Sequence, residues 1–215
     1  MSILKKIIGS KKVIYTANFG SFDPECTNAD KIFNEKNNIY DGCAEHLSSR
    51  LMAKLYKVIN PLNYDIWVDS NLVVLDRKGF EELFEGDLCV FKHPFNKTVR
   101  DEITACKNAG YVNDQQIRRI EDLYKSSGMS VDDTPVYANG MIYRTKKVEE
   151  FNRLWWKLIC MYSYRDQLTF PYALAQFPKL EFRTIDINIY NMDGVTNPYF
   201  LFHPHNTKQS IKKQW

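Results

Sequence analysis

The stretch Tyr64-Asp65-Ile66-Trp67-Val68-Asp69-Ser70-Asn71 is an apolar run that stops at an Asp-Ser-Asn tripeptide. A short Ile-Trp-Val run before turn-forming residues predicts a buried strand. Asp69 and Asn71 stand at positions i and i+2, so their side chains project from the same side of an extended backbone. A carboxylate and an amide placed in this way can share one hard cation, which in turn can hold a diphosphate. The alternative is a strand followed by an ordinary Asx turn, because Asp, Ser and Asn are all turn residues.

Strands and helices alternate on both sides of this stretch. Further strands are expected at residues 12–17, 72–75, 87–91 and 135–143, with one or two more in 180–189. Helices are expected at 45–62, 80–84, 99–109, 114–126, 148–162 and 165–177, and a loop with a helical turn at 23–38. This order predicts an α/β fold with a mixed, mainly parallel central sheet flanked by helices. We expect one domain over residues 1–207, with 208–215 as a basic tail or a linker to a further domain.

Bulk composition excludes several classes of protein. The chain has 215 residues, of which 44% are hydrophobic and 26% charged, as in a globular domain. No apolar run approaches the roughly 20 residues that span a bilayer, and residues 1–12 lack the pattern of a signal peptide, so a cytoplasmic location is expected. A net charge of +3 without a basic stripe argues against nucleic acid. Five scattered cysteines without a Cys-x-x-Cys pair argue against disulfides and structural zinc.

Two more strand ends carry polar or small residues. Thr16, Ala17 and Asn18 follow the first strand, where backbone amides can approach a nucleotide base or ribose. Asn139 and Gly140 interrupt the strand at 135–143, and a glycine there predicts a bulge or a close approach of the backbone to a ligand. Asn139 would then hydrogen-bond a sugar hydroxyl. An ordinary turn at 16–18 and a plain bulge at 139–140 remain the alternatives.

A helix start and a histidine segment complete the acidic and metal-binding candidates. Arg165, Asp166 and Gln167 open the expected helix at 165–177, where Asp166 either faces a reacting sugar or simply caps the helix. His205 lies in a His-Pro-His-Asn segment that Pro204 keeps extended. A neutral imidazole there is a plausible third ligand for a divalent ion, and an ordinary surface histidine is the alternative.

Two cations on the helix before the Asp-Ser-Asn strand are candidates for binding a diphosphate. Arg50 and Lys54 share one helical face through their i, i+4 spacing. The fork of an arginine suits a phosphate or a carboxylate. For Lys54, a solvated helix face is the alternative.

The order of these motifs resembles that of GT-A-fold glycosyltransferases, especially the retaining enzymes of the glycogenin and galactosyltransferase type. Four blocks are also similar to those of a glycosyltransferase-like family of plants and bacteria, once catalogued as a domain of unknown function. They are Ser49-Arg50 with Lys54, Asp65 to Asn71, Lys92-His93-Pro94, and Arg165-Asp166-Gln167-Leu168-Thr169-Phe170. The whole stretch is similar, too, to chlorella-virus glycosyltransferase domains that act on capsid glycans.

This resemblance implies a single GT-A-like, Rossmann-like domain that moves a sugar from a UDP-sugar donor to a glycan hydroxyl, with retention favoured. The sugar it implies is rhamnose or another hexose, and the ion Mn²⁺, with Mg²⁺ as the alternative. Metal ligands would be Asp69 and His205, with Asn71 as a weaker one because it replaces the usual second Asp. Ser70 would belong to the donor site. A viral relative would work in the host cytoplasm, and further catalytic domains of a longer polypeptide are possible partners.

Two competing functions fit the same residues. A nucleotidyltransferase also uses a similar sheet with metal-binding carboxylates, but it releases pyrophosphate in place of UDP. A non-catalytic domain that binds a nucleotide sugar or a carbohydrate is favoured only by Asn71, the departure from Asp-x-Asp.

Overall fold

The computed structural model describes residues 11–20, 23–24, 27–40, 42, 46–190 and 197–205. The expected tail at 208–215 lies outside these residues. None of the described helices is both long enough and apolar enough to cross a bilayer.

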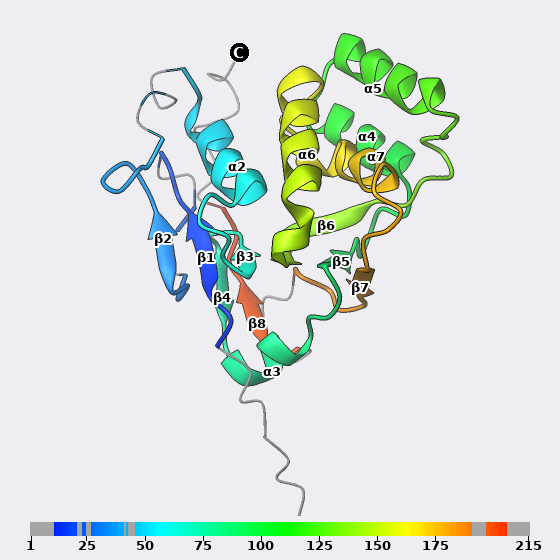
Figure 1. Ribbon diagram of the computed structural model, residues 1–215. Helices are drawn as coiled ribbons and strands as arrows, with labels where there is room; N and C mark the ends of the chain where they lie inside the picture. Colours follow the sequence, from blue (N-terminus) through cyan, green and yellow to red (C-terminus); the bar gives the residue numbers. More distant parts are fainter. Residues whose placement is uncertain are drawn as a thin grey trace, which may run out of the picture.

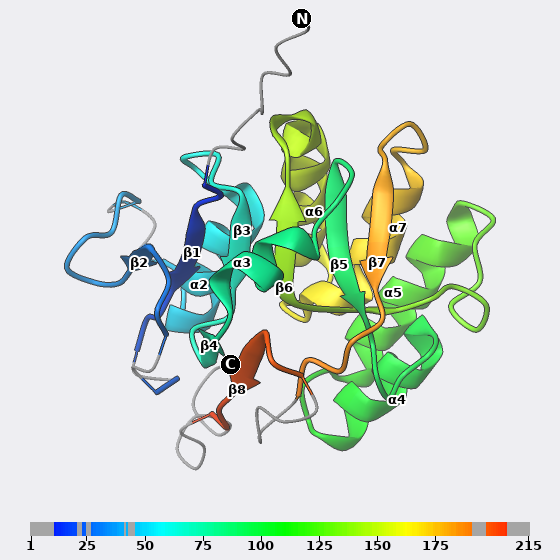
Figure 2. The ribbon, with the colours of Figure 1, turned by 90° about the horizontal axis from the view of Figure 1, so that it is seen from below.

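A six-stranded sheet forms the centre of the described structure, in the order β2-β1-β3-β6-β5-β7 (Figure 2). Its strands are β1 (Ile14–Ala17), β2 (Lys31–Phe33), β3 (Ile66–Val68), β5 (Leu88–Lys92), β6 (Tyr137–Arg144) and β7 (Phe182–Ile185). Strand β1 is parallel to β2 and β3, and β5 is parallel to β7. Only β6 runs against its neighbours β3 and β5. The predicted α/β fold with a mixed, mainly parallel sheet is therefore confirmed.

Helices cover the sheet on one face, and a small second sheet covers the other (Figure 1). The helices of the first face are α2 (Ser49–Ile59), α6 (Glu149–Met161) and α7 (Phe170–Ala175). On the second face lie α3 (Arg77–Glu82) and the antiparallel pair β4 (Leu72–Val74) and β8 (Phe200–Phe202). Helices α4 (Val99–Asn108) and α5 (Asp114–Ser126) pack together around a separate apolar cluster.

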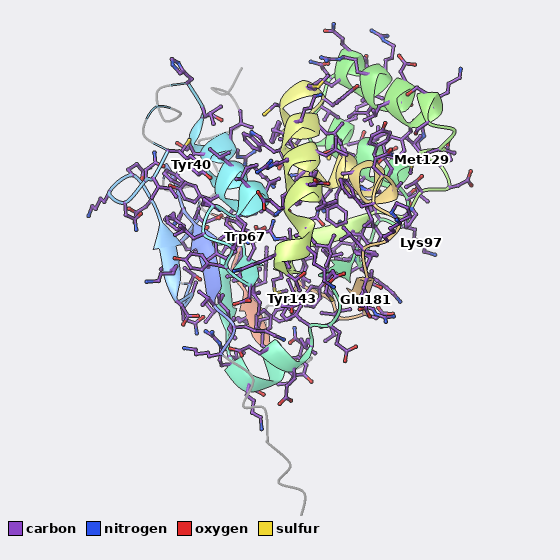
Figure 3. All side chains as sticks on the ribbon, in the orientation of Figure 1. Tyr40, Trp67, Lys97, Met129, Tyr143 and Glu181 are labelled. Atoms are coloured by element: carbon purple, nitrogen blue, oxygen red, sulfur yellow. The ribbon has the colours of Figure 1, made fainter. Side chains whose placement is uncertain are left out.

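Alternation along the strands explains why both faces are apolar. In β1, Tyr15 packs into the cluster under α2 and α6, whereas Ile14 packs into the cluster with α3 and β4. The same holds in β3 for Trp67 and Val68, since successive strand residues point to opposite faces. Trp67 therefore lies on the side of the sheet that α2 covers (Figure 3).

A buried arginine fixes the C-terminal end of α2. Arg144 of β6 is 2% exposed and donates to the carbonyl oxygens of Lys57 (2.5 Å) and Val58 (3.1 Å). It also donates to the hydroxyl of Tyr15. A cation is favourable at a helix C-terminus, where carbonyl groups lack partners. This contact sets the orientation of α2 and hence the direction in which its lysines point.

Two expectations about secondary structure are wrong, and one strand was missed. The stretch 23–38 contains an edge strand, β2, because its main-chain pairing with β1 outweighs its polar composition. The single helix expected at 165–177 is a 3₁₀ turn, η2 (Asp166–Leu168), followed by α7. Pro171 stands in the first turn of α7, where its missing N–H costs nothing, and so begins a new helix. Strand β8 had no counterpart in the expected elements.

The start of β1 supplies a test of stability against pH. Asp30 accepts hydrogen bonds from Arg77 (2.7 Å) and from the backbone N–H of Ile14 (2.9 Å). Burial raises its pKa, but these bonds outweigh burial and lower it from 3.8 to about 2. A depressed carboxyl pKa gives stability that is present above about pH 4 and is lost as the pH falls toward 2.

The Asp30→Asn variant is expected to lose about 1 kcal/mol of unfolding free energy at pH 7, after screening by solvent. The difference from the original chain should shrink as the pH is lowered from 5 toward 2. Urea denaturation at several pH values measures it. A difference that does not change with pH would show that the charge of Asp30 is not involved.

Candidate functional site

One cleft of about 340 Å³ opens where β1 and β3 end. It brings together all the predicted site residues except Thr16: Ala17, Asn18, Arg50, Lys54, Asp69, Ser70, Asn71, Asn139, Gly140, Arg165, Asp166, Gln167 and His205. Thr16 does not line the cleft, because it is fully buried within β1 and alternates in direction with Ala17. A ligand in the cleft can therefore meet Ala17 and Asn18 but not the side chain of Thr16.

The Asp-Ser-Asn element is both a turn and one wall of the cleft. The backbone N–H of Leu72 donates to the carbonyl of Asp69 (3.0 Å), which closes the turn. One carboxylate oxygen of Asp69, Oδ1, accepts from the indole of Trp67 (2.8 Å) and lies 3.4 Å from the ammonium of Lys57. Its other oxygen, Oδ2, has no hydrogen-bond partner among the described residues, and the Asp69 side chain is 35% exposed. The turn thus presents one carboxylate oxygen to the cleft.

The C-terminal segment is tied to this turn by main-chain and side-chain bonds. Asn71 donates its amide N–H to the carbonyl of His203 (2.7 Å), and the N–H of His203 donates to the carbonyl of Asn71 (2.9 Å). The hydroxyl of Ser70 donates to one oxygen of Asp23, whose other oxygen contacts Nδ1 of His205. Asp23 therefore joins the Asp-Ser-Asn turn to the histidine that was predicted to share its metal.

Asp166 is buried between two lysines of α2. Its carboxylate lies 2.5 Å from the ammonium of Lys54 and 2.9 Å from that of Lys57, and its side chain is 3% exposed. Burial raises its pKa, but the two ammonium groups outweigh burial and hold the pKa well below the usual range. No side-chain hydrogen bond caps η2, so Asp166 is not the helix cap that was the alternative interpretation. Asp166 is a permanent anion within the cleft.

Lys57 connects the two carboxylates that line the cleft. It is 2% exposed and contacts both Asp69 and Asp166. Burial lowers its pKa, but the two carboxylates outweigh burial, so the net shift is upward and Lys57 stays charged. In Lys54, for which Asp166 is the one carboxylate in contact among the described residues, burial prevails and, with the charge of Lys57, lowers the pKa to about 8.

A β-bulge turns Asn139 toward the cleft. The register between β5 and β6 jumps from Val90 opposite Ile142 to Phe91 opposite Ala138, as expected for a bulge at the Asn-Gly pair. Gly140 accepts from the N–H of Asp69 (2.7 Å) through its carbonyl. Asn139 is 2% exposed, and both polar atoms of its amide lack a hydrogen-bond partner among the described residues. Such a buried amide is costly unless a ligand satisfies it.

Two arginines and a tyrosine form the remaining cationic wall. The guanidinium groups of Arg50 and Arg165 lie 6.0 Å and 5.0 Å from the ring centre of Tyr111, close enough for cation–π attraction. Arg165 also donates to Glu102 (3.0 Å) and to the amide oxygen of Gln167 (2.9 Å). Gln167 is thereby oriented beside Asp166.

Several residues of the site were missed in the sequence, among them Asp23, Lys57, Trp67, Tyr111, Tyr190 and Phe202. Lys57 had a usable signal, since it stands at i+3 from Lys54 on the same helix. Trp67 lies in β3 two residues before Asp69, which directly follows the strand, so the two side chains are expected on the same face. Asp23 and Tyr190 lie in loops without periodicity, and no local pattern marks them.

Comparisons with known proteins identify the family of the chain. The family model of the TOD1/MUCI70 glycosyltransferase-like domain matches residues 37–197, more than half of the chain. No curated protein matches the sequence. Among solved structures, the crystal structure of a glycosyltransferase involved in the glycosylation of the major capsid of PBCV-1 is similar, with a TM-score of 0.46 and 11% identity over 91% of this chain and 94% of that chain. The chain belongs to the TOD1/MUCI70 glycosyltransferase-like family.

Proposed function

We propose that this glycosyltransferase-like chain transfers a hexose from a UDP-sugar to a glycan hydroxyl, and that the cleft holds the donor. One observation carries the proposal: four cations line the cleft together with two carboxylates. The cations are Arg50, Lys54, Lys57 and Arg165, and the carboxylates are Asp69 and Asp166. Cations at this edge of an α/β sheet suit a bound diphosphate, which brings negative charge to the place where the strands end.

The positions of the lining residues give the donor an orientation. Ala17 and Asn18, at the end of β1, would meet the nucleoside. The diphosphate would lie at Asp69 and the cations of α2, Arg50 and Lys54. The sugar would then lie between Asp166 and Asn139, whose unpartnered amide can bind a hydroxyl through both of its polar atoms.

The residues present fit a divalent cation. Asp69 offers Oδ2, and the buried amide oxygen of Asn71 has no hydrogen-bond partner among the described residues. His205 is oriented by the carboxylate of Asp23, which is how an imidazole ligand is commonly fixed. No group of three His, Cys, Asp or Glu side chains that could hold a metal is present among the described residues, so the proposed site depends on the amide of Asn71 as well as on Asp69 and His205. Asp69, Asn71 and His205 would thus hold Mn²⁺, which when bound neutralises charge on the departing diphosphate.

The ionisation of Asp166 supports a retaining reaction. A general base works best with a pKa near the working pH, whereas the two lysines keep the pKa of Asp166 far below it. A permanent carboxylate instead stabilises positive charge that develops on the sugar ring as the diphosphate departs. Lys54 and Lys57, which contact Asp166, would stabilise the negative charge of the leaving group.

The Asp69→Ala variant tests the donor site directly. It is expected to lose Mn²⁺-dependent UDP binding, because the carboxylate facing the cleft is removed. Isothermal titration calorimetry with UDP, with and without Mn²⁺, measures the effect. Unchanged Mn²⁺-dependent affinity would remove Asp69 from the proposed metal site. Product analysis of the unaltered chain is the companion test, since pyrophosphate in place of UDP would indicate nucleotidyl transfer.

A further inference from the structure

One aromatic side chain beside the cleft is far more exposed than the rest. Phe95 follows β5 in the loop that leads to α4, and 70% of its surface is open to solvent. The other exposed large apolar residues among those described come from other elements and are between 38% and 50% exposed: Ile32, Ile39, Leu62, Leu75 and Met161. A single exposed ring needs no explanation by itself, so the case for Phe95 depends on the aromatic residues that it contacts.

The loop holds Phe95 in a fixed position. Nδ1 of His93 accepts backbone N–H groups from Phe95 (3.3 Å) and Asn96 (2.9 Å). Its other ring nitrogen, 3.7 Å from the Glu102 carboxylate, therefore carries the proton. The His93 side chain is only 6% exposed, and burial lowers its pKa, so the ring stays neutral and keeps both bonds. Phe95 therefore lies in a turn that the hydrogen bonds of His93 hold in place.

A chain of aromatic contacts connects Phe95 to the cleft. Phe95 stacks on Tyr190 with ring centres 5.6 Å apart and planes 15° from parallel. Tyr190 in turn meets the edge of Phe202, with ring centres 5.3 Å apart. Tyr190 and Phe202 both line the cleft. Phe95, Tyr190 and Phe202 are called the aromatic platform below.

The loop that carries Phe95 lies on the far side of the sheet from the proposed nucleoside position, whereas Phe202 lies next to the Asp-Ser-Asn turn and His205. In the sheet order, β3 and β6 separate β1 from β5, whose loop carries Phe95 (Figure 2). Asp69 follows β3, and Gln167, next to Asp166, donates to the carbonyl of Tyr137 in β6 (3.3 Å). The two carboxylates thus lie between the end of β1 and the loop that carries Phe95. A donor bound at β1 would turn its sugar toward the platform side.

We propose that the aromatic platform binds a pyranose ring of the acceptor glycan, an inference that rests on the function proposed above. The apolar C–H face of a pyranose packs on an aromatic face, whose π electrons attract the slightly positive hydrogens. Lys92 and Asp186 lie beside this loop as an exposed ion pair, 2.7 Å apart, with side chains 54% and 80% exposed. An exposed pair of this kind contributes little to stability, so its groups can bind hydroxyls of the sugar instead.

A sugar fits the platform better than a protein partner does. A stable protein interface buries about 800 Å² on each side, with several apolar anchors in one patch. Phe95 is a single strongly exposed ring bordered by charges. The phenol of Tyr190, which is half-buried and whose pKa burial raises to about 12, stays protonated and can donate a hydrogen bond to a hydroxyl beside the stacked ring.

Saturation-transfer NMR on the full chain tests the proposal with methyl α- and β-pyranosides of glucose, galactose, mannose, xylose and rhamnose as probes. Irradiation of the aromatic protons is expected to saturate the ring protons of at least one probe. The Phe95→Ala variant should bind that probe about tenfold more weakly, and Phe95→Trp should retain it. Leu62→Ala, which removes an exposed apolar side chain elsewhere, is the matched control and should behave as the unaltered chain.

Equal saturation in the unaltered chain and in Phe95→Ala would overturn the proposal, as would the absence of saturation for every probe. A dimer in sedimentation velocity that Phe95→Ala abolishes would also overturn it, because a second copy would then cover the ring. UDP titration of the same samples tests the donor function separately from the aromatic platform. UDP binding without pyranoside binding refutes the platform alone, whereas Phe95-dependent pyranoside binding without UDP binding refutes the donor function alone.

Discussion

Replacing Asp166 by asparagine is expected to lower the rate of sugar transfer by about two to four orders of magnitude while UDP binding persists. The substitution keeps the shape of the side chain and removes its charge. Positive charge developing on the sugar then loses its nearest counter-charge. Lys54 and Lys57, which contact this carboxylate at 2.5 Å and 2.9 Å, would still line the proposed donor site. Initial rates of UDP release in the presence of an acceptor, set beside calorimetric UDP affinity, measure the two effects separately.

Asp132→Asn is the matched control for this variant. Asp132 also forms an ion pair, with Arg100 at 2.9 Å, but its side chain is 62% exposed and lies outside the cleft. That variant should keep both rate and affinity. Full turnover by Asp166→Asn would make the carboxylate a structural anchor for the lysines and leave it without a part in the reaction.

Replacing Lys57 by methionine is expected to cost about 3 kcal/mol of unfolding free energy, the largest loss among single changes in the cleft. Removal of the ammonium leaves Asp69 without its cation and Asp166 with one in place of two. The pKa of Lys57 is raised in the folded state, so its stabilisation is fully present at neutral pH and is lost only when the pH rises through that raised value. The midpoint of urea denaturation at pH 7 measures the cost.

Lys54→Met separates the buried charge network from a general effect of losing a lysine on α2. Burial lowers the pKa of Lys54 to about 8, which means that its charge is held at a net cost in the folded state. Its loss should therefore destabilise the fold less than the loss of Lys57. Equal midpoints for the two variants would contradict the network of Lys57 with both carboxylates.

Features with local causes could be predicted from the sequence. The helix expected at 114–126 has these same bounds in α5, because Asn113 and Gln116 form a capping box at its start. The strand end at Asp69 and the bulge at Asn139 were also predicted. An apolar run and a glycine each affect the backbone at their own position, so the signal is local. Their convergence in one cleft follows from the sheet order, which gathers the ends of separate strands.

Features that depend on distant partners could not be predicted. Residues 31–33 form β2 only because β1 offers an open edge, and residues 200–202 form β8 only because β4 does. Asp166 has the sequence position of a helix cap, and its actual role is set by two lysines more than 100 residues earlier. In the sequence Lys57 is an ordinary cation on a helix, because the two carboxylates that contact it come from other parts of the chain.

The bonds between the C-terminal segment and the Asp-Ser-Asn turn also set the order in which the protein can mature. The contact of His203 with Asn71 spans 132 residues, and that of His205 with Asp23 spans 182. The six-stranded sheet contains no residue beyond Ile185, so a nascent chain can assemble it before these contacts exist. During translation, the cations of α2 and both carboxylates leave the ribosome well before the histidine does. A polypeptide that stalls or is clipped before residue 197 would carry the whole sheet and an open, unfinished cleft.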